Sequence, residues 1–322
     1  MIQNFSETTK LTTAEILRLR GSKNVVSSSR PYTFMVEQER SANGEIEDVA
    51  TVFLANSECP YRCLMCDLWK NTLDHPVHSG AIAEQIRYAL KRLPSAKSIK
   101  LYNSGNFFDA RAIPRTDYRE IAELCSPFDR VVVENHPALC NQSCVALNEL
   151  LDGRLEIAMG LETVHPEVLP LLNKQMTLER FAEACDFLVS NSIAIRAFVL
   201  LRPPYLDEEE GIEWAVKSIE FAADCGVGCI AVIPTRAGNG AIEFLAEQGA
   251  FTPPRLSSLE SVLDNVLKEP KAYRVFGDLW DAGRFSSCDR CVDVRVQRIQ
   301  NMNLTQTFQA PVVCDCTEPV SG

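Results

Sequence analysis

The sequence predicts an α/β fold built around a parallel sheet, and two observations lead to that prediction. Apolar runs typical of buried strands alternate with segments whose apolar residues repeat at helical spacing. The run at 46–56 is mostly apolar, as expected for a strand covered on both faces. Strands that alternate with helices favour parallel pairing. An open or partial barrel and a doubly wound sheet both satisfy this pattern.

The elements follow in order along the chain. A short helix is expected at 13–20, and two strands at 32–39 and 46–56 are joined through Asn43-Gly44, a favoured tight-turn pair. Five further strands are predicted at 98–105, 130–137, 155–163, 194–203 and 228–235. With 46–56 they make six parallel strands. After about residue 236 the alternation weakens, and the last section is short and rich in cysteine.

Two of the intervening helices carry a clear apolar stripe. In 79–93 the stripe contains Ile82 and Ile86, with Ser79 as the expected cap. In 177–190 it contains Phe181 and Leu188, with Thr177 as the expected cap. Such stripes are what helices packed on a sheet require.

The composition narrows the class of protein. Of 322 residues, 46% are hydrophobic and 23% charged, as in a packed globular protein. The net charge of −11 argues against a broad basic surface for a polyanion, although a local basic patch or a partner that carries the nucleic acid stays open. No apolar run is long enough to span a membrane, and the first residues are polar, so we expect no signal peptide, no membrane association and a cytoplasmic location.

Three cysteines follow the strand at 46–56 in a C-x3-C-x2-C pattern: Cys59, Cys63 and Cys66. Thiolates are the usual ligands of iron–sulfur clusters. Three of them can hold a [4Fe-4S] cluster and leave its fourth iron open to a small molecule. A zinc site closed by His75 or His78 is the alternative.

Four cysteines close the chain in two pairs: Cys288 with Cys291 and Cys314 with Cys316. Two tight pairs of thiols resemble a zinc-ribbon site. The sequence therefore predicts a metal-binding tail that holds zinc, with an auxiliary Fe–S cluster as the alternative.

Polar residues stand where the predicted strands end. In parallel barrels, functional groups lie at the carboxyl ends of the strands, so these side chains are candidates for a cofactor pocket. Glutamates suit ribose hydroxyls, and a guanidinium suits a carboxylate. The candidates are Asn103, Ser104, Gly105, Glu134, Glu162 and Arg202.

The cysteine triad resembles the signature of the radical S-adenosylmethionine (SAM) superfamily. That resemblance implies a partial (β/α)6 parallel barrel with a small Cys-rich C-terminal appendage, and SAM bound beside a [4Fe-4S] cluster. Asn103, Ser104 and Gly105 match the place where the superfamily binds the SAM amine. The expected parts are an N-terminal extension of helix and hairpin strand at 1–48, the barrel at 49–280 and the metal-binding tail at 281–322.

A closer resemblance rests on longer segments. YNSGNFFD, ENHPA, GLET, LLNKQMT and FTPPRL, with the closing cysteines, are similar to the radical SAM subunit of archaeosine synthase and its uncharacterised bacterial relatives. The resemblance spans about residues 50–316. It implies a radical step on the lysine-modified deazaguanine base of tRNA, together with a separate lysine transferase.

The sequence thus predicts a radical SAM enzyme, a lyase or a transferase. An external donor reduces the cluster, SAM is cleaved reductively, and the 5′-deoxyadenosyl radical abstracts a hydrogen from the substrate. Two other classes stay open: an iron–sulfur electron-transfer protein, and a zinc-binding adaptor that recruits tRNA or a partner without catalysis.

Overall fold

The computed structural model describes residues 10–316, so the outer ends of the expected N-terminal extension (1–9) and tail (317–322) lie outside the described residues. An eight-stranded sheet runs through it in the order β1 to β8. β1 is antiparallel to β2, and every following pair is parallel. The strands are β1 (Thr33–Arg40), β2 (Ile46–Phe53), β3 (Ser98–Tyr102), β4 (Arg130–Glu134), β5 (Arg154–Glu162), β6 (Ala194–Leu201), β7 (Cys229–Pro234) and β8 (Arg274–Gly277).

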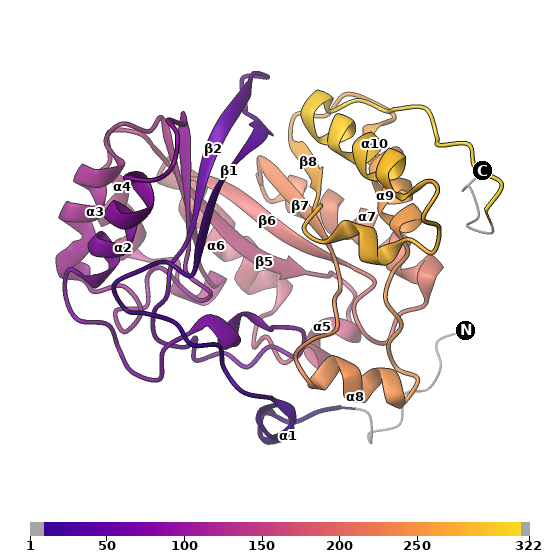
Figure 1. The fold of residues 1–322 in the computed structure, drawn as a ribbon, viewed down its shortest axis with the longest axis horizontal. Coiled ribbons are helices and arrows are strands. Elements are labelled where there is room, and N and C mark those ends of the chain that lie inside the picture. Colours follow the sequence, from indigo (N-terminus) through magenta and orange to yellow (C-terminus); the bar gives the residue numbers. More distant parts are fainter. Residues whose placement is uncertain (1–9, 317–322) are drawn as a thin grey trace.

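The sheet curls into a partial barrel (Figure 1), which confirms the predicted architecture. The strand order follows the chain without reversal, whereas a doubly wound sheet requires a switch point, so that alternative is wrong. The six expected parallel strands are β2 to β7. β8 is a seventh that the sequence pattern did not predict, because Arg274–Gly277 is only four residues long.

Helices cover the outside of the sheet. In Figure 1, α2, α3 and α4 lie on one side, and α7, α9 and α10 lie on the other. The helices are α1 (Thr13–Leu19), α2 (Ala81–Leu90), α3 (Tyr118–Cys125), α4 (Gln142–Asn148), α5 (Val168–Leu171), α6 (Leu178–Ser190), α7 (Glu208–Asp224), α8 (Ala241–Glu247), α9 (Leu256–Leu267) and α10 (Val292–Thr305). None of the helices within residues 10–316 has the length and apolar character needed to cross a bilayer.

The local signals that define the elements are mostly confirmed. Thr177 caps α6, since its side chain accepts a hydrogen bond from the Arg180 amide. The β1–β2 hairpin turns at Asn43-Gly44, where Gly44 has φ +90°, a conformation that favours glycine. The expected cap of α2 is wrong: Gly80 is its N-cap, and the Ser79 hydroxyl instead donates to Asp117 at 2.6 Å.

A buried ion network fills the barrel near the amino ends of the parallel strands. Glu39 of β1 accepts from Lys100 of β3 at 2.6 Å and from Arg196 of β6 at 2.5 Å. Glu156 of β5 accepts from Arg196 at 2.6 Å and from Arg130 of β4 at 3.1 Å. Burial opposes the charge on Glu156, but the two guanidiniums overcome it and lower its pKa to about 2. This base network, defined by these five residues, ties five strands together.

The outer edge of β8 is covered by side chains of α10 rather than by another strand. The Gln306 amide, just after the helix, accepts from the Val275 N–H at 2.7 Å and donates to the Val275 carbonyl at 2.8 Å. Asn303 does the same at Gly277, with distances of 2.8 and 2.9 Å. Two amides therefore supply the hydrogen bonds that a ninth strand would otherwise make.

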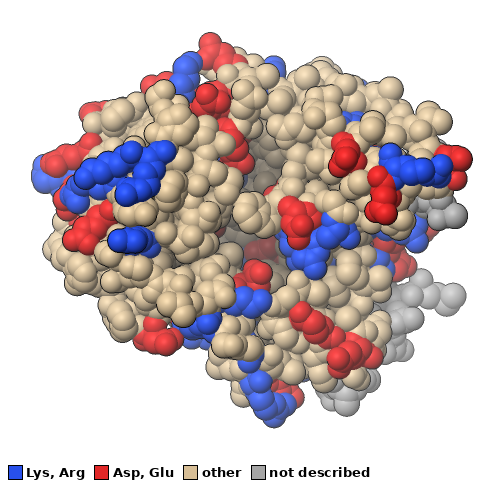
Figure 2. Space-filling model, in the orientation of Figure 1, with Lys and Arg blue, Asp and Glu red and all other residues tan. Residues whose placement is uncertain are grey.

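The face of the molecule seen in Figure 1 is hollowed near its centre, as Figure 2 shows. The hollow lies between the side that carries α2 to α4 and the side that carries α10. Acidic and basic side chains are interspersed on this face, without a broad basic patch. The carboxyl ends of the strands and the segments that follow them carry the candidate site.

Candidate active site at the carboxyl ends of the strands

The cysteine loop, residues 59–66, follows β2 and lies between that strand and the 3₁₀ turn Leu68–Asn71. Cys59, Cys63 and Cys66 are all free and partly buried. Burial raises the pKa of Cys63 to about 11, while the ammonium of Lys174 opposes that rise. The loop thus presents three shielded thiols beside a buried positive charge.

The spacing of these thiols differs from that of a single-ion site. Among residues 10–316, the four closing cysteines form the only group of three or more His, Cys, Asp or Glu side chains placed to share one metal ion, and their ligand atoms all lie within 4.8 Å of one another. The triad is not such a group, with or without His75 or His78, which are both exposed. Three thiols that do not converge on one point fit a centre in which each thiolate binds a different metal atom.

Side-chain amides from two other loops donate hydrogen bonds to backbone carbonyls of the cysteine loop and hold it in place. The Asn239 amide, ahead of α8, donates to the carbonyls of Leu64 at 2.7 Å and Cys66 at 3.3 Å. The Asn173 amide, ahead of α6, donates to the Arg62 carbonyl at 2.7 Å. Asn239 is buried, so its contacts belong to the folded core of the site.

Ion pairs fix the start of the same loop. Glu58 accepts from Arg20 at 2.7 Å, from Lys23 at 2.8 Å and from Arg62 at 3.3 Å. Arg20 ends α1, so this short helix is tied directly to the cysteine loop. The N-terminal helix therefore belongs to the site's scaffold.

The residues after β3 lie against the triad. A Cβ placed on Gly105 would be 3.6 Å from the Cys59 Cβ, and the next side chain, Asn106, donates to the Cys59 sulfur at 3.2 Å. Ser104 has φ +52° and its hydroxyl lies 3.0 Å from the Tyr32 hydroxyl. The buried Oδ1 atom of Asn103 has no hydrogen-bond partner. Residues 103–106 thus form one wall beside Cys59, with an acceptor left for a ligand.

Glu134, at the end of β4, holds the backbone of residues 103–106 in place. Its carboxylate accepts from the Asn103 N–H at 2.9 Å. Burial raises the pKa of Glu134 to about 7, although the backbone N–H groups of Asn103 and Ser104 oppose that rise. The backbone of the 103–105 turn is therefore held by a carboxyl group whose pKa lies close to physiological pH.

Glu162, at the end of β5, forms a buried ion pair with Lys174 at 2.7 Å. Glu162 has φ +67°. The pair occupies the space beside Gly160, where a Cβ would meet both charged groups. Burial opposes the charge on Lys174, but Glu162 overcomes it and raises the pKa of Lys174 above its usual range. The electrostatic influence of Lys174 on Cys63 places this pair beside the triad.

Arg202, at the end of β6, is directed elsewhere. Its guanidinium pairs with Glu208 of α7 at 2.5 Å and donates to the Pro253 carbonyl at 3.1 Å. Neither partner belongs to the cysteine loop or to the ends of β3, β4 and β5. The structure thus brings together the triad, the 103–105 turn, Glu134 and Glu162, but it gives Arg202 a separate set of contacts.

Tyr61 of the cysteine loop stacks on His136, with ring centroids 3.8 Å apart and planes 13° apart. Burial lowers the pKa of His136 to about 4, so the ring is neutral near pH 7. Its Nδ1 accepts from the Ala138 N–H at 3.1 Å, which leaves Nε2 to donate to the Lys174 carbonyl at 3.1 Å. A fixed neutral imidazole thus links the loop to Lys174.

Sequence reasoning assigned no role to several of these residues. Asn173 and Lys174 could have been found, because they lie in the LLNKQMT segment that carries the resemblance to archaeosine synthase. Asn239 lies just after residue 236, where the sequence showed only that the alternation weakens. Asn106 followed the three candidates after β3 directly.

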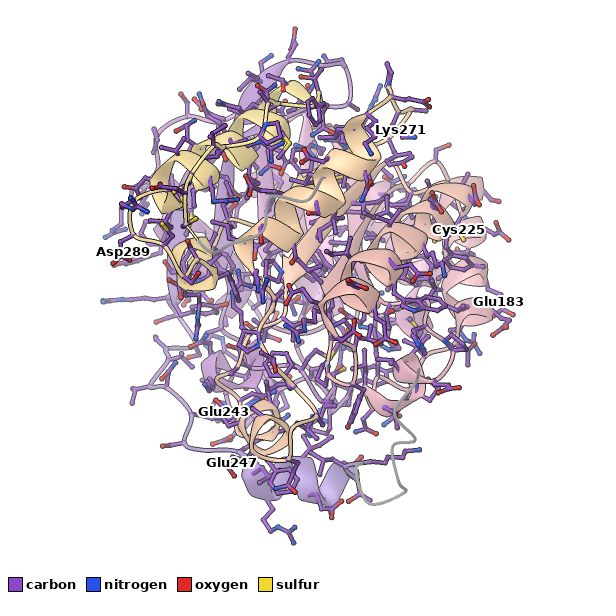
Figure 3. All side chains as sticks on the ribbon, turned by 90° about the vertical axis from the view of Figure 1, so that its right-hand side faces the viewer. Glu183, Cys225, Glu243, Glu247, Lys271 and Asp289 are labelled. Carbon is purple, nitrogen blue, oxygen red and sulfur yellow. The ribbon has the colours of Figure 1, made fainter. Side chains whose placement is uncertain are left out.

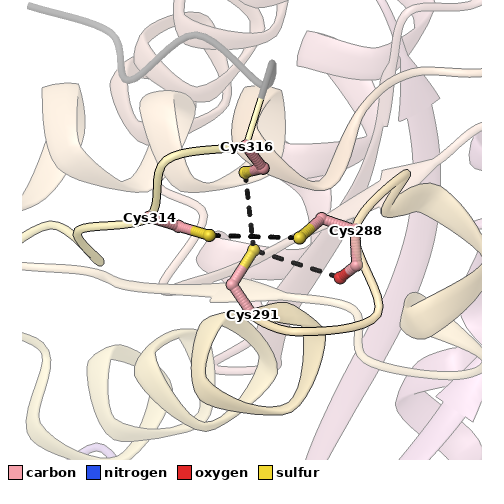
Figure 4. Close-up of side chains that lie close together, drawn as sticks. All are labelled: Cys288, Cys291, Cys314 and Cys316. Atoms are coloured by element: carbon pink, nitrogen blue, oxygen red, sulfur yellow. Dashed lines mark hydrogen bonds between the residues drawn. The ribbon is translucent and has the colours of Figure 1, made fainter.

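The closing cysteines, Cys288, Cys291, Cys314 and Cys316, converge as predicted (Figure 4). The Cys288 and Cys314 sulfurs lie 4.0 Å apart, and those of Cys291 and Cys316 lie 3.8 Å apart. They could hold a metal ion. They form a second centre, contributed by the start of α10 and by the chain that follows it.

No family model matches the chain. An uncharacterised protein of Methanocaldococcus jannaschii is 26% identical over 319 residues, which cover 91% of this chain and 87% of that protein. Archaeosine synthase subunit beta of Thermococcus kodakarensis is 27% identical over 222 residues, covering 66% and 68%. The Methanosarcina acetivorans protein of the same name is 23% identical over 290 residues, covering 85% and 84%.

The fold is also found among solved structures. Elp3 of Methanocaldococcus infernus, truncated at its N-terminus, matches with a TM-score of 0.54 at 15% identity. The match covers 80% of this chain and 63% of the Elp3 chain, so this chain spans less than two thirds of that structure. The chain is therefore similar in sequence to archaeosine synthase subunit beta and similar in fold to Elp3.

Proposed function

We propose that the chain is a radical SAM enzyme whose [4Fe-4S] cluster is held by Cys59, Cys63 and Cys66. One observation carries the proposal: three shielded thiols from one loop do not converge on a single ion, and no fourth ligand closes them among the described residues. When bound, such a cluster supplies the electron that cleaves SAM reductively, and the resulting 5′-deoxyadenosyl radical abstracts a hydrogen from the substrate. An external reductant provides that electron.

The surrounding residues of the chain orient and insulate this centre. The Asn106 amide donates to the Cys59 sulfur, and hydrogen bonds to ligand sulfurs tune iron–sulfur centres. Lys174 offsets the negative charge of the thiolates from a buried position. Asn239 and Asn173 hold the loop backbone, so the three sulfurs keep their spacing.

The SAM amine binds at Asn103, Ser104 and Gly105 in this proposal. The partnerless Oδ1 of Asn103 is an acceptor for an ammonium group, and Gly105 allows close approach beside Cys59. Glu134 acts mainly by holding the backbone of this turn. Glu162 is proposed to bind the ribose hydroxyls through the carboxylate oxygen that does not pair with Lys174, and Arg202 is proposed to bind a carboxylate in place of Glu208.

The proposed substrate is the lysine-modified deazaguanine base of tRNA, and the proposed partner is a separate lysine transferase. The names of two curated relatives, each a subunit beta of archaeosine synthase, support both parts. The net charge of −11 favours a partner that contributes most of the grip on the nucleic acid.

Anaerobic reconstitution followed by a product assay tests the proposal. Protein with iron, sulfide, SAM and dithionite should yield 5′-deoxyadenosine, and Cys63→Ala should yield none. Cys225→Ala is the matched control, because Cys225 is a half-buried thiol at the end of α7. Equal product from Cys63→Ala contradicts the cluster assignment, and reduction of the iron without SAM cleavage indicates an electron-transfer protein.

The substrate is tested separately with tRNA carrying the lysine-modified base. Loss of the lysine-modified nucleoside should require SAM, reductant and intact Cys63. If SAM is cleaved but this tRNA is unchanged, the radical chemistry stands and the substrate proposal fails. Bound tRNA with neither iron nor cleavage indicates an adaptor.

A further inference from the structure

We propose that the closing cysteines bind a single tetrahedral zinc ion, distinct from the cluster of the cysteine loop, and that this ion clasps the chain after α10 onto the start of that helix. The geometry of the four sulfurs carries the proposal. A zinc–sulfur bond of about 2.3 Å requires tetrahedral ligand sulfurs about 3.8 Å apart. The observed pairs are separated by 4.0 and 3.8 Å, and all four sulfurs lie within 4.8 Å of one another (Figure 4).

The same geometry argues against the auxiliary Fe–S cluster that the sequence left open. In such a cluster the four thiolates are divided among two or more iron atoms, so the four sulfurs cannot all lie as close together as they do around one ion. A pair of disulfides does not fit either, because a disulfide bond is about 2.05 Å long and all four cysteines are free. One closed site with four sulfur ligands is typical of structural zinc.

A buried arginine completes the surroundings of the site. The Nε of Arg295, one turn into α10, donates to the Cys291 sulfur at 3.3 Å. Arg295 also pairs with Glu260 of α9, and both side chains are at least 95% buried. Hydrogen bonds to the ligand atoms orient metal ligands and offset their charge. This contact therefore supports a negatively charged tetrathiolate site that is built into the core between two helices.

The chain between the two cysteine pairs shows what the ion would hold. After α10 the chain turns at Gln306, which has φ +55°, and returns along the helix without regular secondary structure. Arg298, in the middle of the helix, donates to the carbonyls of Gln309 at 2.7 Å and Ala310 at 2.9 Å. Cys314 and Cys316 then reach Cys288 and Cys291 at the start of the helix. Zinc thus closes the open end of a helix-and-return hairpin.

This clasp bears on the barrel as well as on the tail. The helix that it anchors is the one whose Asn303 covers the edge of β8, together with Gln306 just beyond it. Because few apolar side chains of the return segment are buried, the ion replaces a hydrophobic core there. Its role is structural, and it takes no part in electron transfer.

Metal analysis of the full chain tests the proposal once iron at the cysteine loop is removed. A variant with Cys59, Cys63 and Cys66 changed to Ser should retain about one zinc per chain. Adding Cys314→Ser should abolish zinc binding and raise hydrogen exchange in residues 306–316. Adding Cys225→Ser should change neither. Figure 3 shows Cys225 on the opposite side of the molecule from Asp289, which lies next to Cys288.

Cobalt substitution keeps the test decisive if Cys314→Ser folds poorly. The intact chain loaded with Co²⁺ should show the visible absorption and sulfur-to-metal charge transfer of a tetrahedral tetrathiolate. Iron with sulfide at the closing cysteines, the absence of bound metal, or full zinc content without Cys314 would each overturn the proposal. All three outcomes leave the assignment of the cysteine loop unaffected.

Discussion

Lys174 and Glu162 form a buried ion pair of 2.7 Å at the carboxyl ends of the strands, next to the thiols of the cysteine loop. The pair joins the chain ahead of α6 to the end of β5. Both groups are shielded, so neither can lose its partner without leaving a charge in the interior.

Lys174→Met should therefore lower the free energy of unfolding by about 3 to 5 kcal/mol, because Glu162 stays buried without a counter-ion. The double variant Lys174→Met with Glu162→Gln should recover most of that loss. Urea denaturation of the metal-free proteins measures both. If the double variant is no more stable than Lys174→Met, the pair is not the source of the effect.

Asn239→Ala should weaken the cysteine loop, and it also removes the acceptor of the Ile242 N–H at the start of α8. The variant leaves the Leu64 and Cys66 carbonyls without a donor, at about 1 to 3 kcal/mol for a buried group. We expect iron content after reconstitution to fall several-fold and SAM cleavage to fall with it.

Asn191→Ala is the matched control. The Asn191 side-chain amide also donates to a backbone carbonyl, that of Phe187 at 2.7 Å, but it does so at the end of α6. It should keep full iron content. Equal losses of iron in both variants would show that the effect is general instability.

Glu134 should make stability depend on pH. Its folded-state pKa of about 7 lies above the ordinary value of 4.5, so folding favours the protonated form. The stability that Glu134 contributes is complete below about pH 4.5 and is lost as pH rises through 7, by up to about 3 kcal/mol. Glu134→Gln keeps an acceptor for the backbone and should remove that decline.

Unfolding free energies measured from pH 5 to 8 check this expectation. The difference between Glu134→Gln and the parent should grow in favour of the variant as pH rises. A constant difference across that range would mean that Glu134 is ionised in the folded protein.

Arg196→Met should destabilise the protein without touching the site. Arg196 pairs with both Glu39 and Glu156, so its loss leaves two buried carboxylates under-compensated, at about 3 to 5 kcal/mol. Thermal unfolding should shift downward, while SAM cleavage per folded molecule at low temperature stays unchanged. A matching loss of cleavage would show that the base network is coupled to the site.

Sequence pattern predicted the strands well where they are long and apolar, as in β2 and β6. It missed β8, because four residues that include Arg274 carry too little periodicity. Spacing predicted the triad and each of the two closing pairs, since residues so close in sequence have few ways to separate. The structure brings the two closing pairs together, and the metal that they hold stays a prediction.

Contacts between residues that lie far apart in the sequence could not be predicted from local sequence pattern. The bond from Asn239 to Leu64 spans 175 residues, and the pairing of Arg202 with Glu208 depends on how α7 follows β6. Such partners are set by tertiary packing rather than by local pattern. The roles proposed for Asn103, Glu134 and Glu162 in binding SAM stay predictions.

The amides of Asn303 and Gln306 on β8 have a consequence for association. An uncovered edge strand is a template for pairing with another chain, so proteins with a partial barrel can aggregate through their edge strands. In this protein, the side chains of Asn303 and Gln306 occupy the backbone hydrogen-bonding groups on the outer edge of β8. Copies of the protein therefore have no free edge on β8 along which to pair.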